Sequence, residues 1–445
     1  MSSGPRAQLI GLSRRLPNRV WVPAVVGFVV ALVFVGALLL RAGGDASLLV
    51  HAGPPWTDAA QTRDSLTVQP ADGAFDGQFF YRLGVAPWST QPEVAGVTYD
   101  LPALRNARWG YGALAWLGSG GNPDLVPWTL LGLNLIAVTA IGAIGGALAG
   151  SAGRHRAWGA LFVFWPGFAY SLSLDTSELV ASAFVLGGLL ALRHRYWLPS
   201  AVLLTAAVLT RDTTAVIPFA VAVSGAHAWM TNRPIQLSPL HNDVAVVPTK
   251  PLSPNELQVA ATRQRSLFAT AAANVRLRQI TEARDTTEVG LIALVAFGGW
   301  QLITRSRFHA LPLTSSGDNN LSAPFGGLVD QVLKVVPPSG SAEALRLICI
   351  VGLVALLGTA GWTWRRSTAS TPERMAWLPA VVVVAVLNAY LWSGATAFMR
   401  ATTEAGLLSI VVILSSTRTR LLAFVGIGLA SLWTLTAIAQ LTKLG

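Results

Sequence analysis

Long apolar stretches with almost no charged residues dominate the hydropathy pattern of this chain, and polar segments separate them. The first covers residues 20–40, which is long enough for a helix to cross a hydrocarbon core about 30 Å thick. Ten more follow, at approximately residues 126–150, 158–174, 179–192, 198–210, 213–230, 289–303, 345–364, 376–393, 405–414 and 421–441. Several are shorter than about 17 residues, so their ends must extend into polar flanks or the helices must lie inside the bundle. The pattern predicts about eleven transmembrane helices.

Composition agrees with this pattern. Hydrophobic residues make up 52% of the 445 residues and charged residues only 12%, which excludes a soluble core with a solvated surface. We predict an all-α polytopic membrane protein in which residues 1–445 form a single integral membrane domain. Arg14, Arg15 and Arg19 precede the first stretch, as in a signal peptide, but the stretch exceeds the usual apolar region of about 7–15 residues. We interpret it as a retained anchor.

Basic residues give the orientation, because Lys and Arg concentrate in cytoplasmic loops. Six polar segments hold most of them: residues 1–19, 154–156, 193–195, 231–287, 365–374 and 418–420. A cytoplasmic N-terminus places all six inside, while the acids collect outside, chiefly between Asp45 and Asp124. The net charge of +11 then reflects this bias and contact with anionic membrane lipids rather than nucleic acid. The sequence predicts a multi-pass plasma membrane protein.

Two polar segments are longer than turns. Residues 41–127 form a predicted extracytoplasmic loop, and residues 231–287 form a predicted cytoplasmic loop. In the second loop, residues 256–284 place Leu267, Phe268 and Val275 at helical spacing with arginines nearby, which predicts an amphipathic helix at the membrane interface. We expect short interfacial helices in the first loop as well.

The first loop carries the strongest candidate for chemistry, Asp76, which lies among aromatic residues in the segment 74–82. A carboxylate beside apolar groups has the raised basicity that acid–base work requires, so Asp76 is the candidate general base. The alternative is that Asp76 caps a helix whose aromatic face lies on the bilayer. Asp72 is the reserve base. His309, in the predicted outside loop 304–343, is a second reserve acid–base or phosphate partner.

Other acids have structural interpretations. Asp100 precedes Leu101-Pro102 and fits an Asx turn, whereas Asp175 and Glu178 fit helix capping. The single cysteine, Cys349, falls in an apolar stretch, and the six histidines have no metal-ligand spacing. The outside loop has no Asp-x-Asp pair. We therefore predict no metal site and no cofactor.

Five arginines are not needed for cytoplasmic orientation and are predicted on the same side as Asp76: Arg82, Arg105, Arg108, Arg211 and Arg400. A guanidinium group is always charged and forks onto phosphate oxygens, so this set suits a lipid phosphate. The alternative is a snorkelling or internally paired arginine, as Arg211 would be with Asp212.

These features together resemble one family. An initial helix, a large outside loop with Phe75-Asp76-Gly77-Gln78-Phe79-Phe80-Tyr81-Arg82-Leu83-Gly84, the segment 105–111, Trp165-Pro166-Gly167 and Leu209-Thr210-Arg211 are similar to the GT-C glycosyltransferases. The nearest comparison is the mannosyltransferase-like branch with a Trp-Asp-x-x-(Tyr/Phe) motif, in which Phe75 stands at the Trp position. The resemblance covers roughly residues 20–220 and implies a GT-C-like helical bundle.

The resemblance also implies a chemistry. A polyprenyl-phosphate sugar would be the donor, and Asp76 would take the proton from a lipid, glycan or protein acceptor hydroxyl that attacks the anomeric carbon with inversion, without a metal. Arg211 and Arg400, with Arg82 and Arg105 as alternates, would stabilise the departing lipid phosphate. We expect further substrate contacts from four residues of the matched segments: Gln78, Tyr81, Arg108 and Tyr111.

The sequence leaves the sugar and the class of activity open. A composition rich in Arg, Ala, Gly and Val is typical of a GC-rich bacterium and would fit an actinobacterial cell envelope, with mannose as the first expected sugar and arabinose as the second. One alternative is a transporter or flippase of lipid-linked saccharides, for which Asp76 would be dispensable. Another is a polysaccharide polymerase or ligase that uses Arg305, Arg307 and His309. The oligomeric state is not predicted.

Overall fold

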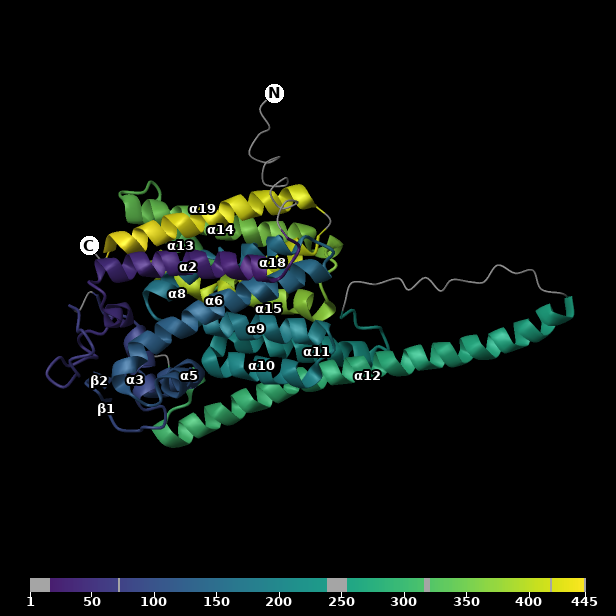
Figure 1. The fold of residues 1–445 in the computed structure, drawn as a ribbon, viewed down its shortest axis with the longest axis horizontal. Coiled ribbons are helices and arrows are strands. Elements are labelled where there is room, and N and C mark those ends of the chain that lie inside the picture. The colour runs from purple at the N-terminus through teal and green to yellow at the C-terminus, as the bar shows by residue number, and fades with distance from the viewer. Residues whose placement is uncertain (1–16, 71–72, 238–253, 316–320, 417, 444–445) are drawn as a thin grey trace, which may run out of the picture.

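The computed structural model describes residues 17–70, 73–237, 254–315, 321–416 and 418–443, with the backbone alone for 254–275. Helices dominate this part of the chain, and most run along the long axis of the bundle (Figure 1). The strands among the described residues are the short antiparallel pair β1 (Glu93–Val94) and β2 (Val97–Thr98). The prediction of an all-α membrane protein is confirmed at this level.

Six helical stretches of the described chain are long and apolar enough to cross a membrane: Trp21–Arg41, Pro123–Ser151, Asp212–Met230, Arg276–Phe308, Ser341–Arg366 and Thr419–Lys443. They contain α2 (Trp21–Arg41), α6 (Val126–Ser151), α11 (Val216–Met230), the C-terminal part of α12 (Pro254–Phe308), α14 (Ser341–Thr363) and α19 (Thr419–Lys443). The pair α17 (Ala395–Ala401) and α18 (Thr403–Leu414), bent by 57°, makes a seventh if it counts as one span.

The remaining predicted spans coincide with shorter helices: α7 (Ala160–Val163) with α8 (Pro166–Ser173), α9 (Glu178–Arg193), α10 (Trp197–Thr210) and α15 (Thr371–Ala385). Every residue of α8 is buried, and so is most of α9. Helices inside a bundle are shielded from lipid by their neighbours, so they need not match the bilayer thickness. The total of eleven spans stays a prediction.

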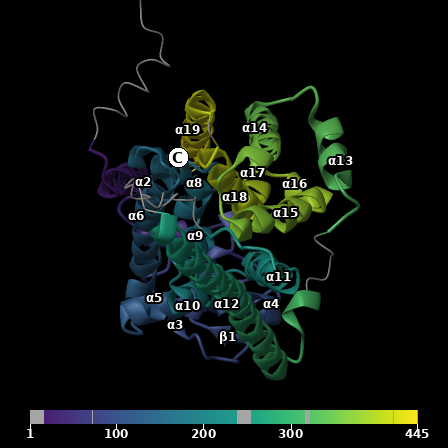
Figure 2. The same ribbon diagram turned by 90° about the vertical axis from the view of Figure 1, so that its right-hand side faces the viewer.

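The structure joins two segments that the sequence separates. The predicted amphipathic helix 256–284 and the predicted span 289–303 form one continuous helix, α12. Neither Pro nor Gly interrupts residues 255–289, so nothing in the sequence stops the helix. The N-terminal part of α12 projects beyond the rest of the bundle (Figure 1), and α12 lies in front of the other helices when the bundle is viewed from that end (Figure 2). Residues 256–284 are therefore helical as predicted, but they continue into the predicted span 289–303 instead of ending before it.

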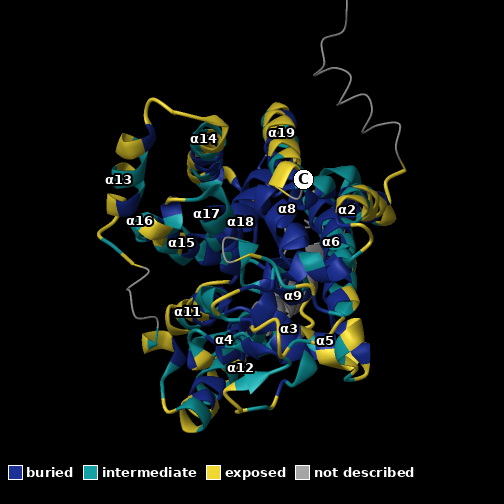
Figure 3. Ribbon diagram, turned by 90° about the vertical axis from the view of Figure 1, so that its left-hand side faces the viewer, coloured by how far each residue is buried: buried dark blue, intermediate teal, exposed yellow. Residues whose placement is uncertain are grey.

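Residues of the first loop fold into η1 (Ala46–Val50), α3 (Gly77–Val85), α4 (Pro102–Ala107) and α5 (Trp109–Ser119) at one end of the bundle (Figure 3). The aromatic face of α3 does not lie on the bilayer. Phe79 and Phe80 are each 4% exposed and Leu83 is 1% exposed, because they pack within the protein. Burial of this face anchors α3 in the protein and thereby fixes the position of Asp76, which directly precedes the helix.

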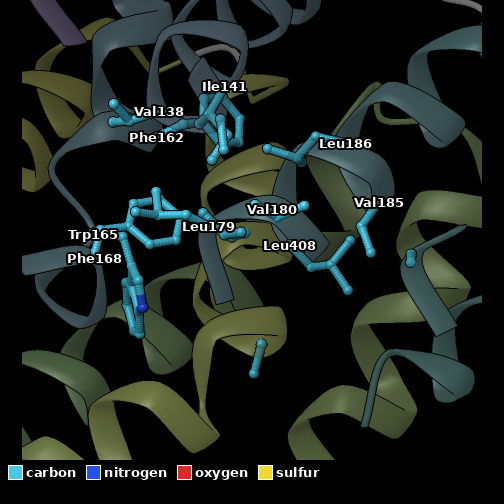
Figure 4. Packing of buried hydrophobic residues seen from close by; sticks show 14 of the residues in the cluster. Val138, Ile141, Phe162, Trp165, Phe168, Leu179, Val180, Val185, Leu186 and Leu408 are labelled. Carbon is cyan, nitrogen blue, oxygen red and sulfur yellow. The ribbon is translucent and has the colours of Figure 1, made fainter. Parts of the chain in front are cut away.

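The centre of the bundle is apolar and closely packed. Side chains from α6, α8, α9 and α18 meet there, among them Val138, Phe168, Leu179 and Leu408 (Figure 4). Trp165, at the start of α8, donates its indole N–H to Thr403 Oγ1 at 3.1 Å. A Cβ atom at Gly406 would lie 2.3 Å from the Trp165 ring, so only glycine permits this approach. The contact holds the bend between α17 and α18 against α8.

Basic turns that the sequence assigns to one side of the membrane meet at the end of the bundle opposite the first loop. Arg193 forms an ion pair with Glu373 across α9 and α15, and both side chains are 1% exposed. Arg195 pairs with Glu282 at 2.6 Å, and Arg154 donates to Thr419 Oγ1 at 2.7 Å. The polar loop 41–127 and these basic turns thus occupy opposite ends.

Candidate functional site

The carboxylate of Asp76 lies between two arginines that are far apart in the sequence. Its Oδ1 accepts a hydrogen bond from Arg105 Nη1 at 2.8 Å, and its Oδ2 accepts one from Arg400 Nη2 at 3.0 Å. Asp76 occupies the N-cap position of α3, but its side chain caps no backbone N–H of that helix. The capping alternative is therefore wrong, and the carboxylate is directed at the arginines instead.

The electrostatic environment keeps Asp76 ionised. Burial alone would raise the pKa of this carboxyl, but the charges of Arg105 and Arg400, with a smaller contribution from Arg108, lower it further than burial raises it. The net result is a pKa well below the usual range for Asp, whereas the sequence interpretation expected raised basicity. Asp76 is a proton acceptor at neutral pH, but a weak one while both arginines hold it.

Behind Asp76, a chain of buried ion pairs runs into the protein. Arg400 Nε donates to Glu178 Oε1 at 2.9 Å, and Arg211 Nη1 donates to the same oxygen. Arg211 Nε in turn donates to Glu404 Oε1 at 2.9 Å, and its Nη2 donates to the carbonyl of Arg400 at 2.8 Å. Glu178 is 1% exposed. These contacts fix the Arg400 guanidinium where it meets Asp76.

Two further ion pairs lie beside these residues. Arg105 forks onto Asp100, with Nε donating to Oδ1 at 2.7 Å and Nη2 to Oδ2 at 2.6 Å. Arg108 Nε donates to Asp212 Oδ1 at 3.0 Å. Asp100 thus anchors Arg105 rather than forming only an Asx turn, and Asp212 pairs with Arg108 rather than with Arg211 as the sequence suggested.

We call the nine side chains Asp76, Asp100, Arg105, Arg108, Glu178, Arg211, Asp212, Arg400 and Glu404 the ion-pair cluster. Asp76 directly precedes α3. Asp100, Arg105 and Arg108 lie before, in and directly after α4. The others lie at the starts of α9, η5 (Asp212–Ala215) and α18, just before η5, and near the end of α17. A Cβ atom at Gly77 would lie 2.4 Å from the Val50 carbonyl oxygen and 2.7 Å from that of Leu174. Glycine at this position lets α3 approach the α8–α9 turn.

Two of the predicted phosphate-binding arginines have structural roles. Arg82 is 1% exposed, lies 3.8 Å from the centre of the Tyr99 ring and donates to the carbonyls of Pro92, Val97 and Gln91. Arg211 is 5% exposed and is held by Glu178 and Glu404. Buried arginines need counter-ions or carbonyls, and those of Arg82 and Arg211 are already supplied by the protein. We therefore withdraw both as phosphate ligands.

Three predicted substrate contacts also lie inside the fold. Gln78 is 2% exposed and its Oε1 accepts a hydrogen bond from Thr57 Oγ1 at 2.7 Å. Tyr111 is fully buried and donates to the carbonyl of Leu130 at 3.0 Å. Tyr81 is fully buried as well. These predictions were wrong because α3 is buried along almost its whole length and Tyr111 lies on the buried face of α5.

The two reserve residues are not part of the cluster. Asp72 lies outside the described residues. His309 follows the end of α12 and is exposed, and no hydrogen bond or ion pair of the described chain joins it to the cluster. Its neighbour Arg307 donates to the carbonyl of Trp88 at 2.7 Å. Among the described residues, no group of three or more His, Cys, Asp and Glu side chains is arranged to hold a metal ion.

Sequence reasoning missed the acids that support the arginines. Glu404 was not singled out, and Glu178 was interpreted as a capping residue, yet its carboxylate accepts hydrogen bonds from Ser171, Arg211 and Arg400. Both glutamates stand at the ends of apolar stretches on the side predicted for Asp76. The requirement that each arginine at such a position have a counter-ion was the signal that could have identified them.

One acid close to the cluster has no hydrogen-bond partner among the residues that the structure describes. Asp175 is fully buried in the α8–α9 turn, has a left-handed φ of 44°, and neither carboxylate oxygen accepts a hydrogen bond. Burial raises the pKa of Asp175 well above its ordinary value. At a pH below the pKa of an ordinary Asp, Asp175 is protonated in both the folded and the unfolded chain and does not destabilise the fold. As the pH rises toward the raised pKa of the folded state, only the unfolded chain loses its proton, so the free energy of unfolding falls.

We expect Asp175→Asn to remove this pH dependence, since Asn is neutral and tolerates a left-handed φ. The melting temperature of the variant should equal that of the wild type in acid and exceed it increasingly as the pH rises. Thermal melts in detergent between pH 4 and pH 9 measure the difference. A variant less stable than the wild type at high pH would mean that the ionised carboxylate has a partner.

The comparisons with known proteins leave the site to be interpreted from its own residues. The chain matches no protein-family model and no curated protein.

Proposed function

We propose that this protein is a membrane glycosyltransferase that transfers a sugar from a polyprenyl-phosphate donor to a hydroxyl group of a glycolipid, glycan or protein acceptor. The observation that carries the proposal is the position of Asp76. Its side chain is 25% exposed, more than any other in the ion-pair cluster. Its two oxygens are nevertheless bound by two arginines that are far apart in the sequence, Arg105 and Arg400. Base and phosphate ligands are therefore adjacent, as transfer from a sugar phosphate requires.

The reaction joins the acceptor oxygen to the anomeric carbon and breaks the bond between that carbon and the phosphate oxygen. Asp76 takes the proton of the acceptor hydroxyl, and the bonding electron pair leaves with the polyprenyl phosphate. Attack from the face opposite the phosphate inverts the anomeric centre. Arg105, Arg400 and Arg108 are the arginines available to match the negative charge that grows on the leaving phosphate.

The charges of the cluster suggest how donor and base cooperate. It holds four arginines and five carboxylates, so no guanidinium is left in excess for a phosphate. A donor phosphate would replace Asp76 on Arg105 and Arg400, the ion pairs nearest to solvent. Release from the two arginines raises the pKa of Asp76 toward its ordinary value, and the base becomes stronger when the donor is bound.

The two ends of the bundle support an orientation for this reaction. Because basic turns favour the cytoplasm, the end with Arg154, Arg193 and Arg195 would face inward, together with the N-terminus, and the cluster would face outward in the plasma membrane. A donor presented in the outer leaflet would then reach the cluster from lipid. Mannose is the first sugar to test and arabinose the second.

The direct test is transfer by the purified full chain in nanodiscs, with short-chain polyprenyl-phosphate mannose or arabinose as donor and cell-envelope lipid extract as acceptor. Formation of a labelled product with release of polyprenyl phosphate is the expected result. Movement of a labelled lipid-linked saccharide across proteoliposomes without transfer would instead support the flippase alternative.

The role of Arg105 gives a separate prediction. We expect Arg105→Lys to lower the transfer rate about 10- to 100-fold and to raise the KM for the donor, since an ammonium group cannot fork onto Asp100 and still reach Asp76. Arg63→Lys is the matched control, because Arg63 lies in the same loop, is 55% exposed and is 3.7 Å from Asp124. Equal donor KM values for both variants would remove Arg105 from the donor site.

A further inference from the structure

Three tryptophans pack against one another, with their rings tilted or edge-on, at the end of the bundle that carries the ion-pair cluster. The ring centres of Trp88 and Trp109 are 4.7 Å apart, those of Trp109 and Trp300 are 5.3 Å apart, and those of Trp88 and Trp300 are 6.4 Å apart. Trp300, on α12, is 8% exposed, whereas Trp88 is 58% exposed. The ring of Trp88 is therefore exposed to the outside and is supported by the rings of Trp109 and Trp300.

Polar contacts hold the group in place. The indole N–H of Trp109 donates to the carbonyl of Pro87 at 3.1 Å, and that of Trp300 donates to the carbonyl of Asn106 at 3.0 Å. Arg307 binds the carbonyl of Trp88 itself. The residues after Trp88 are also fixed, because the buried Arg82 binds the carbonyls of Gln91 and Pro92. An aromatic ring held this firmly loses little conformational entropy when a ligand stacks on it.

The group lies next to the ion-pair cluster. Trp109 directly follows Arg108, which pairs with Asp212 at 3.0 Å and whose charge acts on Asp76. The exposed ring of Trp88 therefore packs on a ring, Trp109, whose neighbour in the chain belongs to the ion-pair cluster. The neighbours of Trp88 along the chain are polar, since Thr90 and Gln91 are exposed and Ser89 is half-buried. A ring that only anchors the protein in the bilayer would be expected among exposed apolar side chains.

We propose that Trp88 is the platform of an acceptor subsite, where the apolar face of a sugar ring of a glycan stacks while its hydroxyls meet Ser89, Thr90 and Gln91. This inference rests on the proposed function and adds the class of acceptor to it: a saccharide-bearing molecule rather than a simple lipid or an unglycosylated protein. It also gives Arg82 and Arg307 roles as positioning residues for the loop that carries Trp88.

The test separates binding from transfer. Saturation-transfer-difference NMR with methyl α-mannoside and with methyl α-arabinofuranoside measures saccharide binding to the full chain in nanodiscs. We expect binding by the wild type and by Asp76→Asn, and at least about tenfold weaker binding by Trp88→Ala, since a stacked aromatic contact contributes on this order. Trp88→Tyr should restore part of the binding. Trp128→Ala is the matched control, because Trp128 is 51% exposed but belongs to α6.

The outcomes are distinguishable from failure of the proposed function. Loss of binding in Trp88→Ala with normal binding in Asp76→Asn and Trp128→Ala would support the subsite even if no transfer were observed. Equal binding by Trp88→Ala and the wild type, or no binding of either glycoside by the wild type, would overturn it. Weaker quenching of Trp88→Ala by brominated lipids, with saccharide binding unchanged, would show that the ring is a bilayer anchor.

Discussion

Asp76→Asn is expected to lower sugar transfer by about 10²- to 10⁴-fold, the contribution of a positioned general base. Asn has nearly the same shape as Asp but cannot take the proton of the acceptor hydroxyl. It also leaves Arg105 and Arg400 free for the donor phosphate, so the KM for the donor should not rise. The measurement is initial rate against donor concentration for both proteins in nanodiscs, after thermal melts have established that the variant is folded.

Asp64→Asn is the matched control for this prediction, because Asp64 is an exposed acid of the same loop. Its transfer rate should equal that of the wild type. Full transfer activity of Asp76→Asn would exclude Asp76 as the base and would move that role to another acid, with Asp72 as the first to test. A higher donor KM with an unchanged rate at saturation would make Asp76 part of the donor site instead.

Glu178→Gln is expected to have the largest effect on stability. One oxygen of Glu178 accepts hydrogen bonds from both Arg211 and Arg400, and the side chain is 1% exposed. Removing its charge leaves two buried guanidinium groups short of a counter-ion, and breaking a buried pair in this way costs about 3–5 kcal/mol. Transfer should fall as well, since Glu178 fixes Arg400 against Asp76.

The readouts are the melting temperature in detergent and the transfer rate at a temperature where the variant is folded. Glu288→Gln is the control, because Glu288 forms an exposed pair with Arg284 in α12, at 48% exposure, and should change stability by no more than about 0.5 kcal/mol. A Glu178→Gln variant as stable as this control would mean that Glu404 alone neutralises Arg211.

Much of the fold follows from the order of residues. Uncharged apolar stretches long enough to span a bilayer predict helices, since every backbone polar group must be paired within the segment in lipid. The structure places a helix or a pair of helices at each of the eleven predicted stretches. The sequence did not predict that α12 is continuous, because the change from a polar to an apolar pattern looked like a boundary although no residue breaks the helix there.

The candidate site was predictable only in part. Asp76, Arg105, Arg108 and Arg400 stand out locally, as charges in aromatic or apolar surroundings, and the structure brings these four together. Gln78, Tyr81 and Tyr111 were chosen from the same segments, yet they are buried, because other parts of the protein cover α3 on all sides and Tyr111 lies on the buried face of α5.

The sequence alone determined that this chain is an all-α membrane protein with an acid and several arginines gathered outside its apolar segments. The hydropathy and charge of each segment depend only on its own residues, so membrane-spanning segments and charged loops can be predicted directly from the sequence. Only the tertiary structure decided which charges meet: Arg400 is 324 positions from Asp76, and Glu404 is 193 positions from Arg211. Which buried charges form ion pairs depends on how the helices pack. A hydrogen bond forms only between groups that the fold places within about 3 Å of each other.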